Sequence, residues 1–180
     1  MSTFKFFHDP EVFETLWKAI DAGRFDIMEQ QFRENPLLLG VYYTTDGSGY
    51  RMTLLHKAVC EDNVVAARWL VNHGIPVNAM VERDNIRIRA ASMGENWGMA
   101  PIHLAALYSA EPKTLQFLME AGADINEKGD HGWTPLHLAA WDNPNPEIAE
   151  YLVSAGADTT AKDDEGSTPY GDDVTDLPET

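Results

Sequence analysis

Residues 132–140, Gly-Trp-Thr-Pro-Leu-His-Leu-Ala-Ala, indicate how the whole chain is built. Thr134 and Pro135 supply a helix start, because threonine caps the first turn and proline at the first helical position sacrifices no hydrogen bond. A short apolar helix follows and ends at the Asn-Pro-Asn-Pro of 143–146. A second amphipathic helix then runs to Gly156, which is placed to adopt the left-handed conformation that closes helices. Neither helix can bury its apolar face alone, so the pair needs neighbours of the same kind.

Those neighbours are present upstream. Residues 100–106, Ala-Pro-Ile-His-Leu-Ala-Ala, match 134–140 at a spacing of 34 residues, and 53–59 is a looser copy. A period near 33 residues with a Thr-Pro-Leu-His-x-Ala core resembles the ankyrin repeat. The resemblance is strong over 98–165, good over 51–80, and degenerate but traceable over 11–40.

The resemblance implies an all-α ankyrin-repeat solenoid in a single domain spanning 1–180. We expect four repeats and a truncated C-terminal cap, at approximately 11–50, 51–97, 98–131, 132–165 and 166–180. Two connections are longer than a regular ankyrin turn, so hairpin-like insertions are expected between repeats 1 and 2 and between repeats 2 and 3.

The second insertion, residues 81–94, carries an unusual share of the positive charge. Arg83, Arg87 and Arg89 are three of only thirteen basic residues in the chain, and the last two lie in an alternating Ile-Arg-Ile-Arg segment typical of a half-buried strand. Two interpretations remain open. In the first, the arginines pair with neighbouring acids. In the second, they project from the insertion and contact the partner, because inserts in repeat arrays often line the binding face.

The formal net charge of −16 bounds the possible partners. It opposes binding to nucleic acid or to an anionic membrane and favours a basic protein partner. The alternative is that an acidic surface only keeps the protein soluble. From Asp163 onward there are seven acids and no Lys or Arg, which indicates a solvated cap.

The expected cellular location rests on targeting and membrane features that the sequence lacks. No apolar run is long enough to span a membrane, and the N-terminus lacks a signal-peptide pattern. Cys60 is the single cysteine, which suits a reducing compartment. We therefore expect a cytoplasmic protein, monomeric when free.

The three histidines His56, His103 and His137 share one repeat position. The resemblance implies that they bond backbone groups of the turns and tie adjacent repeats together. No catalytic, cofactor-binding or metal-binding residues are predicted, because no ligand-spaced partner recurs with these histidines. An enzyme-like alternative rests on Cys60 and Glu61 beside His56.

The remaining interpretation is binding. In the ankyrin fold, turn tips and the exposed side of each first helix form a concave groove. Aligning the repeats places there, as candidate partner-binding residues, Tyr50, Met52, Glu61, Trp97, Met99, Tyr108, Asp130, His131, Trp133, Trp141 and Asp142, with Arg87 and Arg89 from the insertion. Aromatic side chains dominate interface hot spots, so Trp97, Tyr108, Trp133 and Trp141 are the expected anchors. Alternatively, some of these rings only pack between repeats, above all Trp133.

The sequence therefore predicts a non-enzymatic protein–protein interaction module. Its partner is expected to have a basic or mixed basic-hydrophobic surface. Two settings stay open: an inhibitor or immunity protein of a basic enzyme, and an adaptor or host-directed effector. A nucleic-acid mimic is a further alternative, resting on the acidic C-terminal end.

Overall fold

The computed structural model describes residues 10–40, 50–80, 82–83 and 98–171. Within these residues the chain forms eight α-helices, two 3-10 helices and two short strands. The α-helices are α1 (Pro10–Asp21), α2 (Phe25–Glu34), α3 (Leu54–Cys60), α4 (Val64–Asn72), α5 (Pro101–Tyr108), α6 (Lys113–Glu120), α7 (Pro135–Asp142) and α8 (Pro146–Ser154). The 3-10 helices are η1 (Pro36–Gly40) and η2 (Asp130–Gly132), and the strands are β1 (Tyr50–Arg51) and β2 (Glu82–Arg83).

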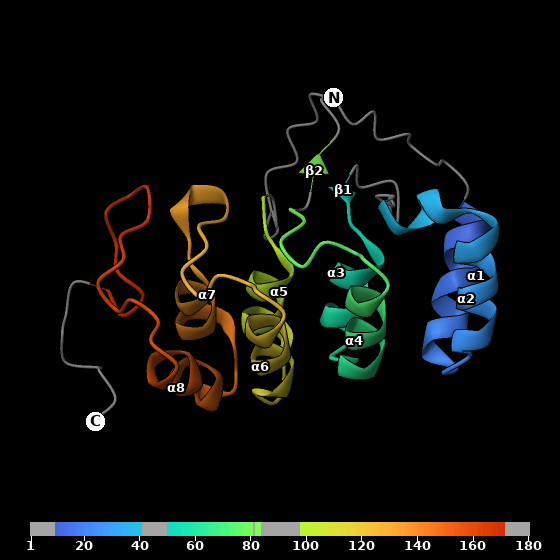
Figure 1. Ribbon diagram of the computed structural model, residues 1–180. Coiled ribbons are helices and arrows are strands. Elements are labelled where there is room, and N and C mark those ends of the chain that lie inside the picture. The colour runs from blue at the N-terminus through green and yellow to red at the C-terminus, as the bar shows by residue number, and fades with distance from the viewer. Residues whose placement is uncertain (1–9, 41–49, 81, 84–97, 172–180) are drawn as a thin grey trace.

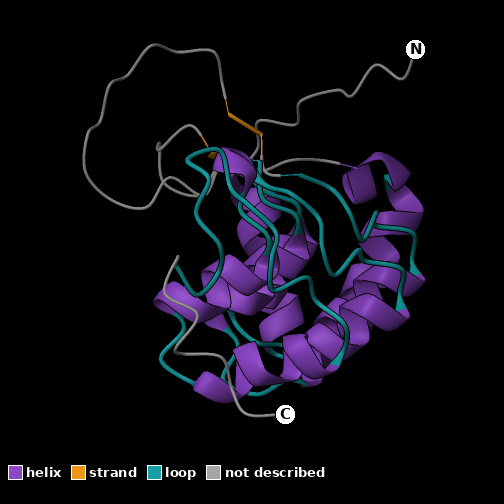
Figure 2. Cartoon of the chain, turned by 90° about the vertical axis from the view of Figure 1, so that its left-hand side faces the viewer, coloured by secondary structure: helices purple, strands orange, loops and turns teal. Residues whose placement is uncertain are grey.

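The helices pack as four consecutive pairs in a single row (Figure 1). The first helix of one pair contacts the first helix of the next, as α3 does with α5 and α5 with α7. Figure 2, viewed from the C-terminal side, shows the helices stacked behind one another with loops alongside. The predicted all-α repeat architecture is confirmed.

The last pair shows why these residues form these helices. Helix α7 begins at Pro135 with Thr134 at the N-cap, and it ends at Asp142, before the Asn-Pro-Asn-Pro segment. Helix α8 begins at Pro146, where the side chain of Asn145 accepts a hydrogen bond from the Glu147 amide at 3.1 Å. Beyond α8, Gly156 has φ 99° and closes the helix as predicted.

One cluster of buried apolar side chains runs through the row. Its largest fully buried members come from successive helices: Leu16, Ile20, Met28, Leu54, Leu55, Leu70, Ile102, Leu104, Leu115 and Leu118. Because the cluster is continuous, each pair is stabilised mainly by burying apolar surface against its neighbours.

A row of buried histidines connects the pairs. In each case Nδ1 accepts from the backbone N–H of the residue before the helix, at 3.1 Å for Thr53, Ala100 and Thr134. The opposite nitrogen, Nε2, then donates to a carbonyl of a following turn. Its acceptors are Met99 for His56 (3.2 Å), Glu127 (2.9 Å) and Trp133 (3.2 Å) for His103, and Ser167 for His137 (3.2 Å). The predicted structural role of the three histidines is confirmed.

The strands form a contact between the two insertions. β1 and β2 pair in antiparallel fashion, with Tyr50 opposite Arg83 and Arg51 opposite Glu82. The sequence did not predict this pairing. Residues 41–49, where the insertion between repeats 1 and 2 is expected to form a hairpin, lie outside the described residues, as does the alternating Ile-Arg-Ile-Arg segment at 86–89.

The array ends beyond α8. The described residues after α8 contain no further helix, although Ser167-Thr-Pro-Tyr resembles another repeat start. Pro169 is buried, and the Ser167 carbonyl accepts the His137 bond. This segment therefore covers the last pair as a cap. Among the helices that the structure describes, none combines the length and apolar character that crossing a membrane requires.

We predict that protonation of the histidine row destabilises the fold. Burial lowers the pKa of His56 from its ordinary 6.5 to about 4, and burial also lowers the pKa values of His103 and His137. The folded state holds the neutral rings, so for His56 this stabilisation is complete above pH 6.5 and is lost as pH falls toward 4. His56 should contribute a slope on the order of 1 kcal/mol per pH unit within that window, and His103 and His137 act in the same direction.

Urea unfolding at pH 7.5 and pH 5 measures this effect. His56→Asn keeps an acceptor for the Thr53 amide but cannot bind a proton, so its free energy of unfolding should depend less steeply on pH. The carboxylates titrate in both proteins, so their contribution to the pH dependence of the free energy of unfolding cancels when the two proteins are compared. Identical slopes for the two proteins would contradict the prediction.

Candidate functional site

Aromatic side chains gather at the C-terminal end of the array, where η2 meets α7. The rings of Trp133 and Trp141 meet edge to face, with centroids 5.8 Å apart and an angle of 86°. On one side of this pair, His131 lies 4.9 Å from Trp133, and on the other, His137 lies 5.2 Å from Trp141. We call His131, Trp133 and Trp141 the aromatic tip cluster.

The scaffold holds Trp133 through its backbone. Its carbonyl accepts from His103 Nε2 at 3.2 Å and from the Gly129 amide at 2.8 Å, while its own amide donates to the Asp130 carbonyl at 3.2 Å. The ring is partly buried and packs against the core. The objection that Trp133 packs between repeats is therefore correct in part, since its ring contributes to both core and surface.

His131 adopts the left-handed conformation, with φ 55° and ψ 15°, which is uncommon for a side-chain-bearing residue. Two contacts support it. Asp130 Oδ1 accepts from the His131 amide at 3.1 Å, and the His131 carbonyl accepts from the Asp164 amide at 2.8 Å. Next along the chain, Gly132 has φ 70°, and a Cβ placed there would lie 2.7 Å from Asp164 Oδ1. The turn therefore fits closely against the cap.

The cap contributes a carboxylate that the sequence analysis missed. Asp163 Oδ1 accepts from the amides of Ser167 (2.8 Å) and Glu165 (2.9 Å), and the Trp133 side chain donates to the same carboxylate. Burial acts to raise the pKa of Asp163, but these hydrogen bonds outweigh it and hold the pKa below its ordinary value. Asp163 thus has a structural role within the segment that the sequence predicted as a solvated cap, and the equivalent position 34 residues upstream is Gly129, so the internal repeat gave no signal for it.

A second group of side chains lies at the C-terminal ends of the first helices. We call it the first-helix face; it comprises Cys60, Glu61, Leu107, Tyr108, Trp141 and Asp142. Trp141 is 41% exposed and Tyr108 is 48% exposed, although both are large rings. Among the described residues, the other exposed large hydrophobic side chain is Val65, on a second helix. The structure therefore brings two of the predicted aromatic anchors to the surface of adjacent first helices.

Charge on this face is negative toward α7. Asp142 is exposed, and Asp130 is partly exposed beside the tip cluster. Glu61 is exposed as well, but Lys57 Nζ lies 2.5 Å from its carboxylate and also 5.1 Å from the Trp17 ring centroid. The carboxylate predicted at the N-terminal end of the face is therefore largely neutralised.

The remaining predicted site residues differ in where the structure places them. Met99 is 1% exposed and belongs to the core, so its prediction as a binding residue is wrong. The flexible side chain of Met99 is fully enclosed in the core, whereas the larger ring of Trp133 at the equivalent position is only partly buried. Met52 is partly buried against the core, and Tyr50 lies in β1. Trp97, Arg87 and Arg89 lie outside the described residues.

The chemistry of Cys60 does not suit a nucleophile. Burial raises the pKa of its thiol to about 11, so little thiolate exists at neutral pH. His56 is fully buried and donates to a backbone carbonyl, so it is not placed as a base for Cys60. No group of His, Cys, Asp and Glu within the described ranges could hold a metal ion.

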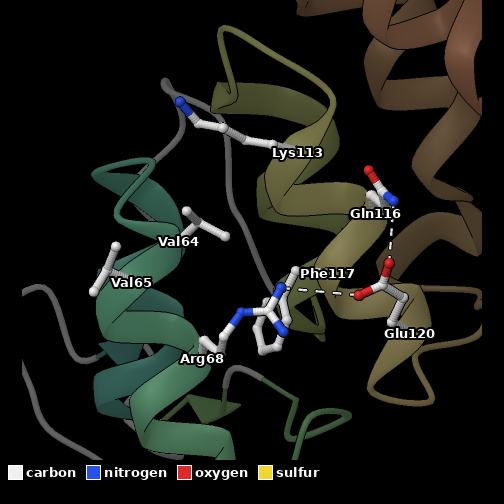
Figure 3. A pocket seen from close by; sticks show the side chains of 7 residues that line it. All are labelled: Val64, Val65, Arg68, Lys113, Gln116, Phe117 and Glu120. Carbon is white, nitrogen blue, oxygen red and sulfur yellow. Dashed lines mark hydrogen bonds and ion pairs between the residues drawn. The ribbon is translucent and has the colours of Figure 1, made fainter.

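A shallow hollow of about 280 Å³ lies between α4 and α6 (Figure 3). Of its two cations, Lys113 pairs with Glu111 at 3.2 Å, and Arg68 stacks over the Phe117 ring at 4.6 Å and pairs with Glu120 at 3.8 Å. Gln116 donates to the same carboxylate group at 3.1 Å. Because these polar groups already pair with one another, the hollow is a weaker candidate than the first-helix face.

The structure predicts that truncating the aromatic residues and Met99 has unequal effects on stability. Trp141→Ala should cost less than about 1 kcal/mol, because much of the ring is already in water, whereas Trp133→Ala should cost about 2–3 kcal/mol. Met99→Ala should cost about 2–4 kcal/mol as a core cavity. Urea unfolding measures all three, and a larger loss for Trp141→Ala than for Trp133→Ala would contradict this description.

The thiol of Cys60 should react slowly. Its pKa of about 11 against an ordinary 9.0 leaves about 100-fold less thiolate at pH 7.5. Alkylation by iodoacetamide should accordingly be about two orders of magnitude slower than that of a free cysteine peptide. A rate equal to that of the peptide would contradict this description, and a faster rate would show an activated thiol and revive the enzyme-like interpretation.

Comparison with known proteins agrees with this architecture. The family model described as ankyrin repeats (3 copies) matches residues 16–128 and 87–163. Rabankyrin-5 from Mus musculus is 36% identical over 90 residues, and Rabankyrin-5 from Homo sapiens is 36% identical over 87 residues. Each match covers 47% of this chain but only 7% of the relative. Taken with the helix pairs and the histidine row, the family match shows that this chain belongs to the ankyrin-repeat proteins.

Proposed function

We propose that this chain binds a basic or mixed basic-hydrophobic segment of a protein partner on its first-helix face and aromatic tip cluster. Ankyrin repeats are protein–protein interaction modules, and the family is generally non-enzymatic. The observation that carries the finer proposal is the exposure of Trp141 and Tyr108 on adjacent first helices. Exposed rings of this size gain much apolar burial when a partner covers them.

The charge around these rings supports a cationic partner. Residues 98–171 contain twelve acids and only three lysines, and helices α5 and α7 contain neither Lys nor Arg. A positive segment would be attracted to this end of the array and would bind more weakly as salt increases. The ring faces also favour cations, tryptophan most of all.

An inhibitor of a basic enzyme is the setting that we favour, because an acidic module that binds cationic surface can cover such an enzyme's substrate site. An adaptor uses the same face without blocking catalysis. Affinity purification from the native host, followed by an activity assay of the partner, separates the two. Loss of partner activity on binding supports inhibition, and full retention supports the adaptor.

We predict that Trp141→Ala and Tyr108→Ala each weaken binding of the purified partner by about 30-fold, equivalent to about 2 kcal/mol. Isothermal titration calorimetry at low and high salt measures the change. Val65→Ala is the matched control, since Val65 is 63% exposed but lies on α4, and it should leave affinity unchanged. Unchanged affinity in both ring variants would overturn the proposal.

A further inference from the structure

We infer that the partner segment lies across α3, α5 and α7 in an extended polyproline II conformation, with a cationic side chain on α7 and an apolar one three residues away on α5. This inference rests on the proposed function and specifies the register of the ligand on the same face.

The register follows from the repeat. Leu107 and Trp141 are equivalent positions 34 residues apart, as are Tyr108 and Asp142. Each first helix therefore offers one position at which a side chain of the bound segment can make contact. Directly packed helices have axes about 8–10 Å apart. A polyproline II chain rises about 3.1 Å per residue and turns once every three residues, so side chains i and i+3 share one face about 9 Å apart. The two spacings match.

The α7 position suits a cation. Trp141 presents a partly exposed ring, and Asp142 beside it carries an exposed carboxylate that forms no ion pair with any residue the structure describes. An arginine side chain can stack its guanidinium on the ring and donate to the carboxylate. Asp130, partly exposed beside the aromatic tip cluster, adds to the negative potential at this end.

The α5 position suits an apolar side chain. Tyr108 and the partly buried Leu107 are uncharged, and α5 has no charged residue at all. One helix further, Lys57 and Glu61 pair with each other at 2.5 Å, so that end of the face presents little net charge. The face therefore changes from acidic at α7 to apolar at α5 and to charge-balanced at α3, which gives a bound segment a direction.

An α-helical ligand fits this face less well. Its residues i and i+7 also lie about 10 Å apart, but residues i+3 and i+4 then point between α5 and α7. Across the described part of the first helices, Tyr108 and Trp141 are the exposed large apolar side chains, so the face offers no third exposed ring or large apolar side chain for those residues to contact. An extended segment makes no such demand.

Synthetic peptides test the register directly. Twelve-residue, proline-rich peptides of identical composition carry one Arg and one Leu separated by two, three or four positions, in both orders. A helix-forming peptide carries the same pair seven positions apart. Binding of each labelled peptide to the full chain is measured by fluorescence anisotropy, and Val65→Ala serves as the folded control.

The peptide whose Arg and Leu are three positions apart, in one of the two orders, should bind at least about fivefold tighter than the peptides in which they are two or four positions apart. Trp141→Ala and Tyr108→Ala should each abolish the preference for the separation of three, because each variant removes one of the two contact positions. Equal affinities at all separations, still weakened by Trp141→Ala, would overturn the register and leave the binding face standing. Tightest binding by the helical peptide would also overturn it. Peptide binding that neither ring variant changes would count against both the register and the proposed face.

Discussion

The structure depends on one buried interaction, the hydrogen bonds that each repeat-position histidine makes in two directions. Nδ1 closes the start of its own helix, and Nε2 reaches a carbonyl in a following turn. Only the neutral ring with its proton on Nε2 can accept at Nδ1 and donate at Nε2. The fold thereby selects one protonation state and one tautomer, and desolvation enforces both.

The same bond positions the candidate site. His103 donates to the carbonyl of Trp133, so the interaction that joins two helix pairs also fixes the backbone beneath the aromatic tip cluster. The ring of Trp133 meets the ring of Trp141 edge to face, and the Trp133 side chain donates to the cap carboxylate of Asp163. The scaffold and the candidate site therefore share one backbone, and the ring of Trp133 belongs to both.

Much of this organisation could be predicted from the sequence, because helix caps, proline positions and a fixed repeat period are local signals. The site was less predictable. Alignment places Met99 and Trp133 at one repeat position, yet Met99 is buried and Trp133 is only partly buried. The repeat register determines where the backbone lies, whereas the size of the side chain determines how much of it stays exposed. The Asp163 contact and the pairing of β1 with β2 arise from tertiary proximity, which no local pattern encodes.

The aromatic tip cluster lies within one helix pair and its preceding turn, whereas Tyr108 belongs to the pair before it. Duplication of a repeat between them would leave the contact between Trp133 and Trp141 intact and would move Tyr108 one helix spacing away. Ligand length in such a protein would change in whole steps of about three residues. The number of repeats would then set the length of the partner segment that can bind, while Trp133 and Trp141 would still contact the same end of that segment.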